Sequence, residues 1–210
     1  MAGALVLLAL AAPRASAQNR PATILVGATA IGPLSGTADR FGIGFGVDAG
    51  AIFRITSQTG IRADWVFGNL GQAGDWPQPP LAVPFDSKLR AQFGTVDFVF
   101  SGPPASFQLY LMAGVGVYFR RVEVTGLGSG ELSVCDPWWF VCTDGEVSSA
   151  QVVGARSHTS VGVNVGAGVR YGRFFIEGRF HYADGPTFST PAGNQKATGK
   201  FFPVTVGVLF

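Results

Sequence analysis

The sequence predicts an all-β fold, an eight-stranded antiparallel up-and-down transmembrane β-barrel. Three observations predict it. Apolar residues recur at every second position over most of the chain, which is the period of a β-strand. Only 13% of the 210 residues are charged, about half the share typical of a soluble domain, so charge to coat a water-facing surface is lacking. Connections between the predicted strands alternate between long and short, as in barrels that cross a membrane.

The start of the chain has the features of a secretory signal peptide. Residues 4–12 form an apolar run that is too short to cross a bilayer, which takes about 20 residues in a helix. Pro13 ends this run, and Ala15-Ser16-Ala17 supplies the small residues of a cleavage site. We therefore expect residues 1–17 to be a signal peptide cleaved after Ala17, and residues 18–210 to form the barrel domain.

Eight segments carry the alternating pattern of a strand. In the segment 41–54, every second residue from Phe41 to Phe53 is apolar, and the opposite face is rich in glycine. Several segments are 12 to 14 residues long, whereas an ordinary strand has about five or six. The predicted strands are 22–32, 41–54, 59–70, 87–100, 107–120, 159–171, 174–182 and 197–210.

The segment 87–100 departs from a simple alternation. By parity, Leu89 and Phe93 share one face with Ala91, whereas Phe98 shares the opposite face with its apolar neighbours. A β-bulge inserts one residue and would bring both groups onto the same side. We therefore expect a bulge near Gly94, which turns Asp97 toward the interior.

Alternation alone does not tell which face of the wall is wet. A soluble barrel such as a lipocalin has the same period, with the apolar face inward. Only three lysines, Lys88, Lys196 and Lys200, exist to solubilise an outer wall. Glycines crowd the polar face, and the interior of an eight-stranded barrel has room for small residues and a packed polar set. We therefore expect the apolar face to point outward, toward lipid.

The chain ends in an alternating apolar stripe that closes on a phenylalanine: Phe202, Val204, Val206, Val208 and Phe210. This stripe resembles the signal read by the outer-membrane barrel assembly machinery. The stretch 161–182 is similar to the last hairpins of OmpA-like, OmpX-like and opacity-type barrels. The resemblance implies a small outer-membrane β-barrel of the porin family, located in the cell outer membrane. Its implied partners are outer-membrane lipid, lipopolysaccharide and the assembly machinery.

Strand parity places a set of charged residues on the inward face. Buried charges are tolerated when they are paired and hydrogen-bonded, so we interpret the set as a salt-bridged plug of the lumen. A charge-lined conduction path would use the same residues, and their spacing does not separate the two interpretations. The set comprises Asp48, Arg62, Asp64, Arg120, Glu177, Arg179 and His181, together with Arg54 and Arg170.

His158 and Ser160 lie on the same face of a predicted strand. The pair looks like the His-x-Ser of outer-membrane lipid A deacylases, in which the His acts as a base toward a Ser nucleophile. Such an enzyme must present the pair to lipid, whereas parity turns it toward the lumen. No Glu on a neighbouring strand is at an evident height to orient the His. We therefore expect no enzyme activity and keep a lipid-modifying enzyme as an alternative.

The longest connection, 125–156, contains the two cysteines Cys135 and Cys142. Exported proteins meet oxidising conditions, so two cysteines most simply form one disulfide bond. Aromatic residues at the tip of such a loop mark either a contact surface or part of the girdle at the membrane rim. The aromatic residues between the two cysteines are Trp138, Trp139 and Phe140.

The sequence favours a structural or surface-interaction role through the loops 71–86 and 125–156, with an extracellular ligand as a possible partner. A narrow porin-like channel is the first alternative. The formal net charge of +2 comes from scattered residues and gives no electrostatic case for nucleic acid. We expect no cofactor and no metal, because the cysteine loop offers too few ligands and the glycine repeats follow the strand period.

Overall fold

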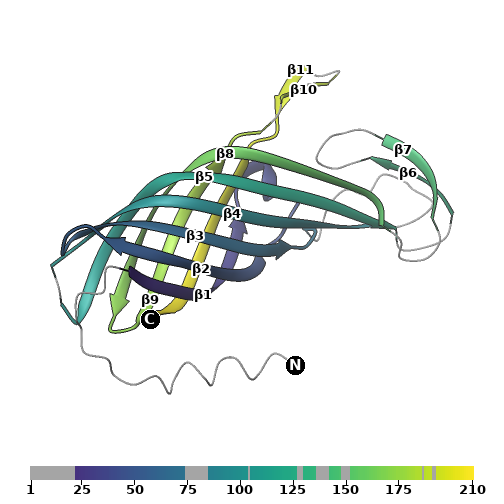
Figure 1. Ribbon diagram of the computed structural model, residues 1–210. Coiled ribbons are helices and arrows are strands. Elements are labelled where there is room, and N and C mark those ends of the chain that lie inside the picture. Colours follow the sequence, from purple (N-terminus) through teal and green to yellow (C-terminus); the bar gives the residue numbers. More distant parts are fainter. Residues whose placement is uncertain are drawn as a thin grey trace, which may run out of the picture.

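The computed structural model describes residues 22–73, 85–103, 105–126, 130–135, 142–147, 152–185, 187–190 and 193–210. Its main feature is a closed barrel in which the strand order is β1-β12-β9-β8-β5-β4-β3-β2 (Figure 1). All pairs are antiparallel, and each barrel strand lies beside the next barrel strand of the chain. The predicted eight-stranded up-and-down topology is therefore confirmed.

The barrel strands follow the predicted segments closely. The largest differences are in β5 and β8, which have 20 residues each and run past the ends of the predicted strands. In the added part of β5 the inward positions are apolar and the outward ones polar, the reverse of the predicted pattern. Val122 and Val124 are buried, and Arg121 is exposed. The strands are β1 (Ala22–Pro33), β2 (Gly44–Arg54), β3 (Thr59–Leu70), β4 (Phe85–Ser101), β5 (Phe107–Gly126), β8 (Val152–Tyr171), β9 (Phe174–Ala183) and β12 (Gly199–Leu209).

Short elements occupy the long connections, all at one end of the barrel (Figure 1). The 3-10 turn η2 (Ser35–Thr37) follows β1. The described residues also form two hairpins, β6 (Gly130–Cys135) with β7 (Cys142–Val147) and β10 (Thr187–Thr190) with β11 (Gly193–Lys196). Among the described residues, no helix is both long and apolar enough to cross a membrane.

The opposite end carries the short turns between β2 and β3, between β4 and β5, and between β8 and β9. The last of these turns places Gly172 at a φ of 59°, in the left-handed region that glycine adopts without a steric penalty. This allows β8 to reverse into β9 over only two intervening residues, Gly172 and Arg173. The long and short connections therefore lie at opposite ends, as the sequence predicts.

The first and last strands close the barrel. Their pairing runs from Leu25 opposite Leu209 to Pro33 opposite Phe201. At the short-turn end, Ile24 N donates to Phe210 O at 3.2 Å and Phe210 N donates to Ile24 O at 2.9 Å, so the last residue completes the seam. The C-terminal stripe faces outward: Phe202, Val204, Val206 and Phe210 are exposed, and Val208 is partly exposed.

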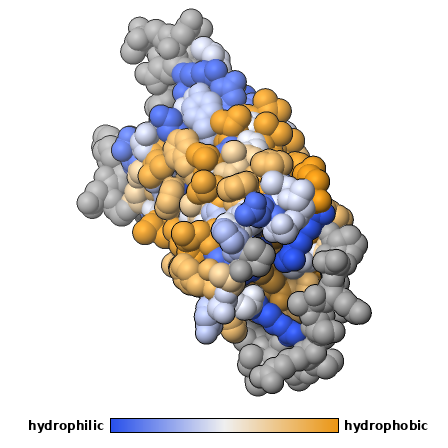
Figure 2. Space-filling view, turned by 90° about the vertical axis from the view of Figure 1, so that its left-hand side faces the viewer, coloured by the Kyte–Doolittle hydropathy of each residue, from blue (hydrophilic) through white to orange (hydrophobic). Residues whose placement is uncertain are grey.

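The wall is apolar outside and mixed inside. Outward side chains such as Phe45 and Leu111 are 73% and 61% exposed, and apolar side chains cover much of the wall in Figure 2. Inward side chains such as Asp48 and Arg62 are at most 1% exposed. The predicted orientation of the two faces is therefore confirmed.

The expected bulge near Gly94 is wrong. Across its described length, β4 pairs with β3 and β5 without a register shift at this position. Phe93 points inward and is fully buried, Phe98 points outward, and Asp97 is buried as expected. The strand is regular, and its odd-numbered residues face inward throughout. These inward residues are apolar toward the long-loop end, where the lumen is apolar, and polar at the height of the charged layer, so the apolar residues change face along the sequence.

This finding predicts unequal effects of two phenylalanine substitutions on β4. Phe93→Ala should lower the free energy of unfolding by about 3–5 kcal/mol, because it leaves a cavity in the closed interior. Phe98→Ala should cost clearly less, since lipid fills the space that the ring vacates. Urea unfolding of the protein folded into vesicles measures both. Equal losses would contradict the assignment of the two faces.

Candidate functional site

The lumen is filled in three layers. A charged layer in the middle separates two apolar layers, one toward each end of the barrel. The apolar layer at the short-turn end contains Leu25, Ile52, Phe175 and Leu209, and beside them Val99, Tyr110 and Met112. The apolar layer at the long-loop end contains Ile31, Phe41, Val66, Leu70, Leu89, Ala91, Phe93, Tyr118, Val122, Val124, Ala183 and Phe201.

Arg179 of β9 is at the centre of the charged layer. Its side chain is 2% exposed, and its guanidinium spans the lumen from β9 to the strands β2, β3 and β4. A guanidinium presents five donors in a planar fork, so one side chain can hold several carboxylates. Arg179 contacts Glu177 at 2.7 Å, Asp64 at 3.0 Å, Asp48 at 3.2 Å and Asp97 at 3.4 Å.

Arg62 of β3 holds three of the same carboxylates from the opposite side. Its two terminal nitrogens donate to both oxygens of Glu177, at 2.6 and 2.9 Å, which is a bidentate pair. Its Nε donates to Asp64 at 2.5 Å, and Nη2 donates to Asp48 at 3.0 Å. The two arginines therefore link β2, β3 and β9 through shared carboxylates in a space closed to water.

Neutral donors supply the hydrogen bonds that two guanidiniums cannot give to four carboxylates. Charge in the sequence does not single out these donors, although each has the inward parity of its strand. Their hydrogen bonds run from Thr95 Oγ1 to Asp64 (2.8 Å), from Asn164 Nδ2 to Asp97 (2.7 Å) and from Tyr110 OH to Glu177 (2.7 Å).

Glycines of the inner face leave the space that the charged layer occupies. Gly114 lies directly opposite Asp97 in the β4–β5 pairing, and a Cβ on Gly114 would collide with the Asp97 carboxylate. Gly168 lies opposite Tyr110, whose ring would meet a Cβ at 2.5 Å. The glycine-rich polar face in the sequence is thus the counterpart of long side chains on neighbouring strands.

Two predicted members of the network lie beside it, in the apolar layer at the long-loop end. Arg120 donates to the backbone oxygen of Asp184 at 2.9 Å. The His181 Nδ1 atom is 3.0 Å from the Tyr118 hydroxyl, and its ring stacks on Phe93 with 5.2 Å between centroids. The ion pairs of the charged layer therefore join Asp48, Arg62, Asp64, Glu177 and Arg179 of the predicted set, and also Asp97.

The His158 and Ser160 pair lies on the inner side of β8. The Ser160 hydroxyl accepts a hydrogen bond from Arg120 at 3.3 Å, and His158 lies opposite Arg120 in the β5–β8 pairing. This agrees with the parity expectation. The arrangement does not present the pair to lipid at the outer wall, as a lipid-modifying enzyme would require.

The candidate contact surface Trp138, Trp139 and Phe140 lies outside the described residues, as does the predicted signal peptide. The register of β6 and β7 places Cys135 directly opposite Cys142. Opposed positions on paired strands are close enough in backbone for a disulfide bond, which stays a prediction.

No model of a known protein family matches the sequence, and no curated protein matches it. Solved structures with a similar fold include Ail, the attachment invasion locus protein of Yersinia pestis in complex with the heparin analogue sucrose octasulfate. The match has 12% identity and a TM-score of 0.47, and it covers 90% of this chain and 97% of that one.

Neisserial surface protein A matches with 16% identity and a TM-score of 0.48, over 90% of this chain and 96% of that one. CarO of Acinetobacter baumannii matches with 10% identity and a TM-score of 0.38, over 88% of this chain and 97% of that one. At these identities and TM-scores the matches carry no conclusion about what this chain does, and the description of its fold rests on its own closed strand order.

The charged layer predicts a large loss of stability in Arg179→Ala. Removing one partner leaves buried carboxylates uncompensated, which typically costs about 3–5 kcal/mol of unfolding free energy. The matched control is Arg121→Ala, whose guanidinium is half exposed and pairs with Glu123 at 2.8 Å. This control should change the free energy by no more than about 1 kcal/mol. Urea unfolding in vesicles measures both, and similar losses would contradict a central role for Arg179.

Proposed function

We propose that this protein is an outer-membrane β-barrel with a closed lumen, which acts through its surface loops in a structural or surface-interaction role. The observation that carries the proposal is the charged layer between two apolar layers inside the barrel. A barrel filled in this way leaves its exposed ends as the places where function can lie.

The apolar outer surface of the barrel supports the proposal that the protein spans a lipid bilayer. Phe45, Leu111 and Val161 are each more than 60% exposed, and they belong to a belt of apolar side chains on all eight barrel strands. A contiguous apolar surface of this extent would associate in water. A closed barrel pairs every strand, so no backbone edge faces hydrocarbon. Export through a signal peptide in residues 1–17 and assembly through the stripe ending at Phe210 fit this location.

The lumen supports a plug better than a channel. An ion crossing the barrel would have to separate Arg179 and Arg62 from carboxylates that they hold at 2.5–3.4 Å. It would also have to pass two apolar layers, where an unpaired charge is costly. We therefore assign the charged layer to closing and stabilising the barrel.

The long connections support a surface role. They all lie at one end, and the connection between β5 and β8 carries the cysteine-flanked segment with Trp138, Trp139 and Phe140. Tryptophan is among the residues that most often carry binding energy at protein interfaces. A disulfide bond between Cys135 and Cys142 would close this segment into a small ring that presents its aromatic side chains.

The combined variant Trp138→Ser, Trp139→Ser, Phe140→Ser tests the proposal. We expect attachment of cells that display the barrel, to surfaces coated with extracellular-matrix protein or with lipopolysaccharide, to fall by about tenfold or more, the effect of losing an interface anchor. The folded barrel should keep its heat-modifiable gel shift.

The control is Phe188→Ser, an aromatic residue in the other hairpin at the same end. Attachment that is unchanged in the combined variant, or reduced equally by Phe188→Ser, would contradict a contact role for the cysteine-flanked segment. In the same preparations, a maleimide should label Cys135 and Cys142 only after reduction, and rapid labelling before reduction would exclude the ring.

A further inference from the structure

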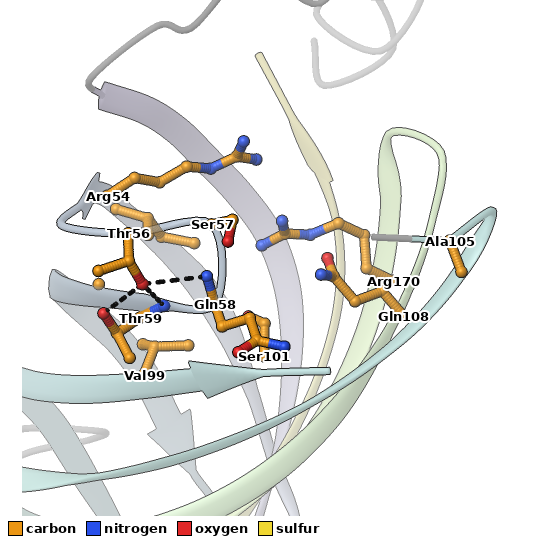
Figure 3. A pocket seen from close by; sticks show the side chains of 12 residues that line it. Arg54, Thr56, Ser57, Gln58, Thr59, Val99, Ser101, Ala105, Gln108 and Arg170 are labelled. Atoms are coloured by element: carbon orange, nitrogen blue, oxygen red, sulfur yellow. Dashed lines mark hydrogen bonds between the residues drawn. The ribbon is translucent and has the colours of Figure 1, made fainter. Parts of the chain in front are cut away.

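At the short-turn end, the lumen opens into a cup of about 190 Å³ (Figure 3). The turn between β2 and β3 forms one wall, and the turn between β4 and β5 together with the end of β8 forms the other. Ile52 and Val99 also line the cup; both belong to the apolar layer beneath it and are 6% and 3% exposed. The cup is therefore a separate space at the mouth of the closed barrel, large enough for several water-sized groups.

Of the described residues, two arginines and no acidic residue line this cup. Arg54 ends β2 and Arg170 lies near the end of β8, and their guanidinium groups point toward one another from opposite walls (Figure 3). Within the described part of the chain, neither guanidinium has an ion pair, and the buried Nε of Arg170 has no hydrogen-bond partner. Two like charges facing one space without a counter-charge make it a site of positive potential.

Polar groups around the cup are held in place by the turn itself. Thr56 Oγ1 accepts hydrogen bonds from the backbone nitrogens of Gln58 at 3.2 Å and Thr59 at 3.0 Å. It also lies 2.8 Å from the Thr59 hydroxyl (Figure 3). Ser101 N donates to Gln58 O at 2.7 Å, which ties the turn to β4. These hydrogen bonds fix the backbone of the turn that carries Ser57 and Gln58, whose side chains also line the cup. A fixed turn lowers the entropic cost of binding a ligand there.

We propose that this cup binds a phosphate group, held between Arg54 and Arg170. Planar guanidinium donors match the oxygens of a phosphate, and hydroxyl and amide donors complete the shell of a tetrahedral anion. Arg170 also lies over the Tyr110 ring, 5.8 Å from guanidinium carbon to centroid, which fixes its direction. The site lies at the end opposite the surface loops, so it is independent of the function proposed for them.

The same chemistry can come from free phosphate or from the headgroup of a phospholipid at the barrel rim. Isothermal titration of inorganic phosphate into the barrel in dodecyl maltoside micelles, which contain no phosphate, tests the site. The wild type should bind. Arg170→Gln should weaken binding at least tenfold, and the Arg54→Gln, Arg170→Gln double variant should abolish it. Among the described residues neither side chain has an ion pair to lose, so both variants should fold.

Arg173→Gln is the matched control, because Arg173 is at the same end but does not line the cup. It should leave the affinity within twofold of wild type. Repeating the titration in micelles doped with phosphatidylglycerol identifies the source. A tenfold weaker apparent affinity assigns the site to a lipid headgroup, and an unchanged affinity assigns it to free phosphate. No binding, or equal binding by wild type and the double variant, would overturn the proposal.

Discussion

The pairing of two buried guanidiniums with four carboxylates in a narrow lumen is the interaction on which the structure depends. Arg179 by itself contacts carboxylates of β2, β3 and β4, strands that do not pair with β9 through the backbone, and Arg62 adds a second link between β3 and β9. Backbone hydrogen bonds fix neighbours along the wall, whereas this layer fixes opposite sides of the wall to one another. Taking these charges out of water is costly, and the layer is tolerable because guanidiniums and neutral donors face the carboxylates at hydrogen-bond distance.

Other features of the molecule follow from this layer. Small residues such as Gly114 and Gly168 face it, because the long side chains of neighbouring strands occupy the space where a Cβ would stand. Apolar layers on both sides keep it dry. The ends of the barrel are then chemically separate, with extended loops and hairpins at one end and an arginine-lined cup at the other.

Period-two alternation predicted the eight strands, and the alternating connection lengths predicted their order. The outward apolar face needed two further observations, the scarcity of lysine and the glycine-rich polar face. Alternation also placed Asp48, Arg62, Asp64, Glu177 and Arg179 inside, because parity alone decides the side of the wall on which a residue lies. Parity does not give height along the barrel axis. For that reason the sequence grouped Arg120 with the charged layer, although its hydrogen bonds to Ser160 and Asp184 lie in the apolar layer at the long-loop end.

The inverted pattern of β4 has the same origin. Phe93 faces the lumen, and Phe98 faces outward. The rule that inward residues are polar and outward residues apolar fails here, because the lumen is charged in one layer and apolar in the next. Thr95, Tyr110 and Asn164 were missed because a neutral donor becomes part of an ionic layer only through the register of its strand.

The central claim is that the charged layer and its apolar neighbours close the lumen. Single-channel conductance of the refolded protein in a planar bilayer tests this claim most directly, with a heat-modifiable gel shift to establish that the barrel is folded. The account predicts no conductance steps from the folded wild-type barrel. Steady openings of the wild type that change in Glu177→Ala would contradict it, because they would show that ions pass along the charged layer.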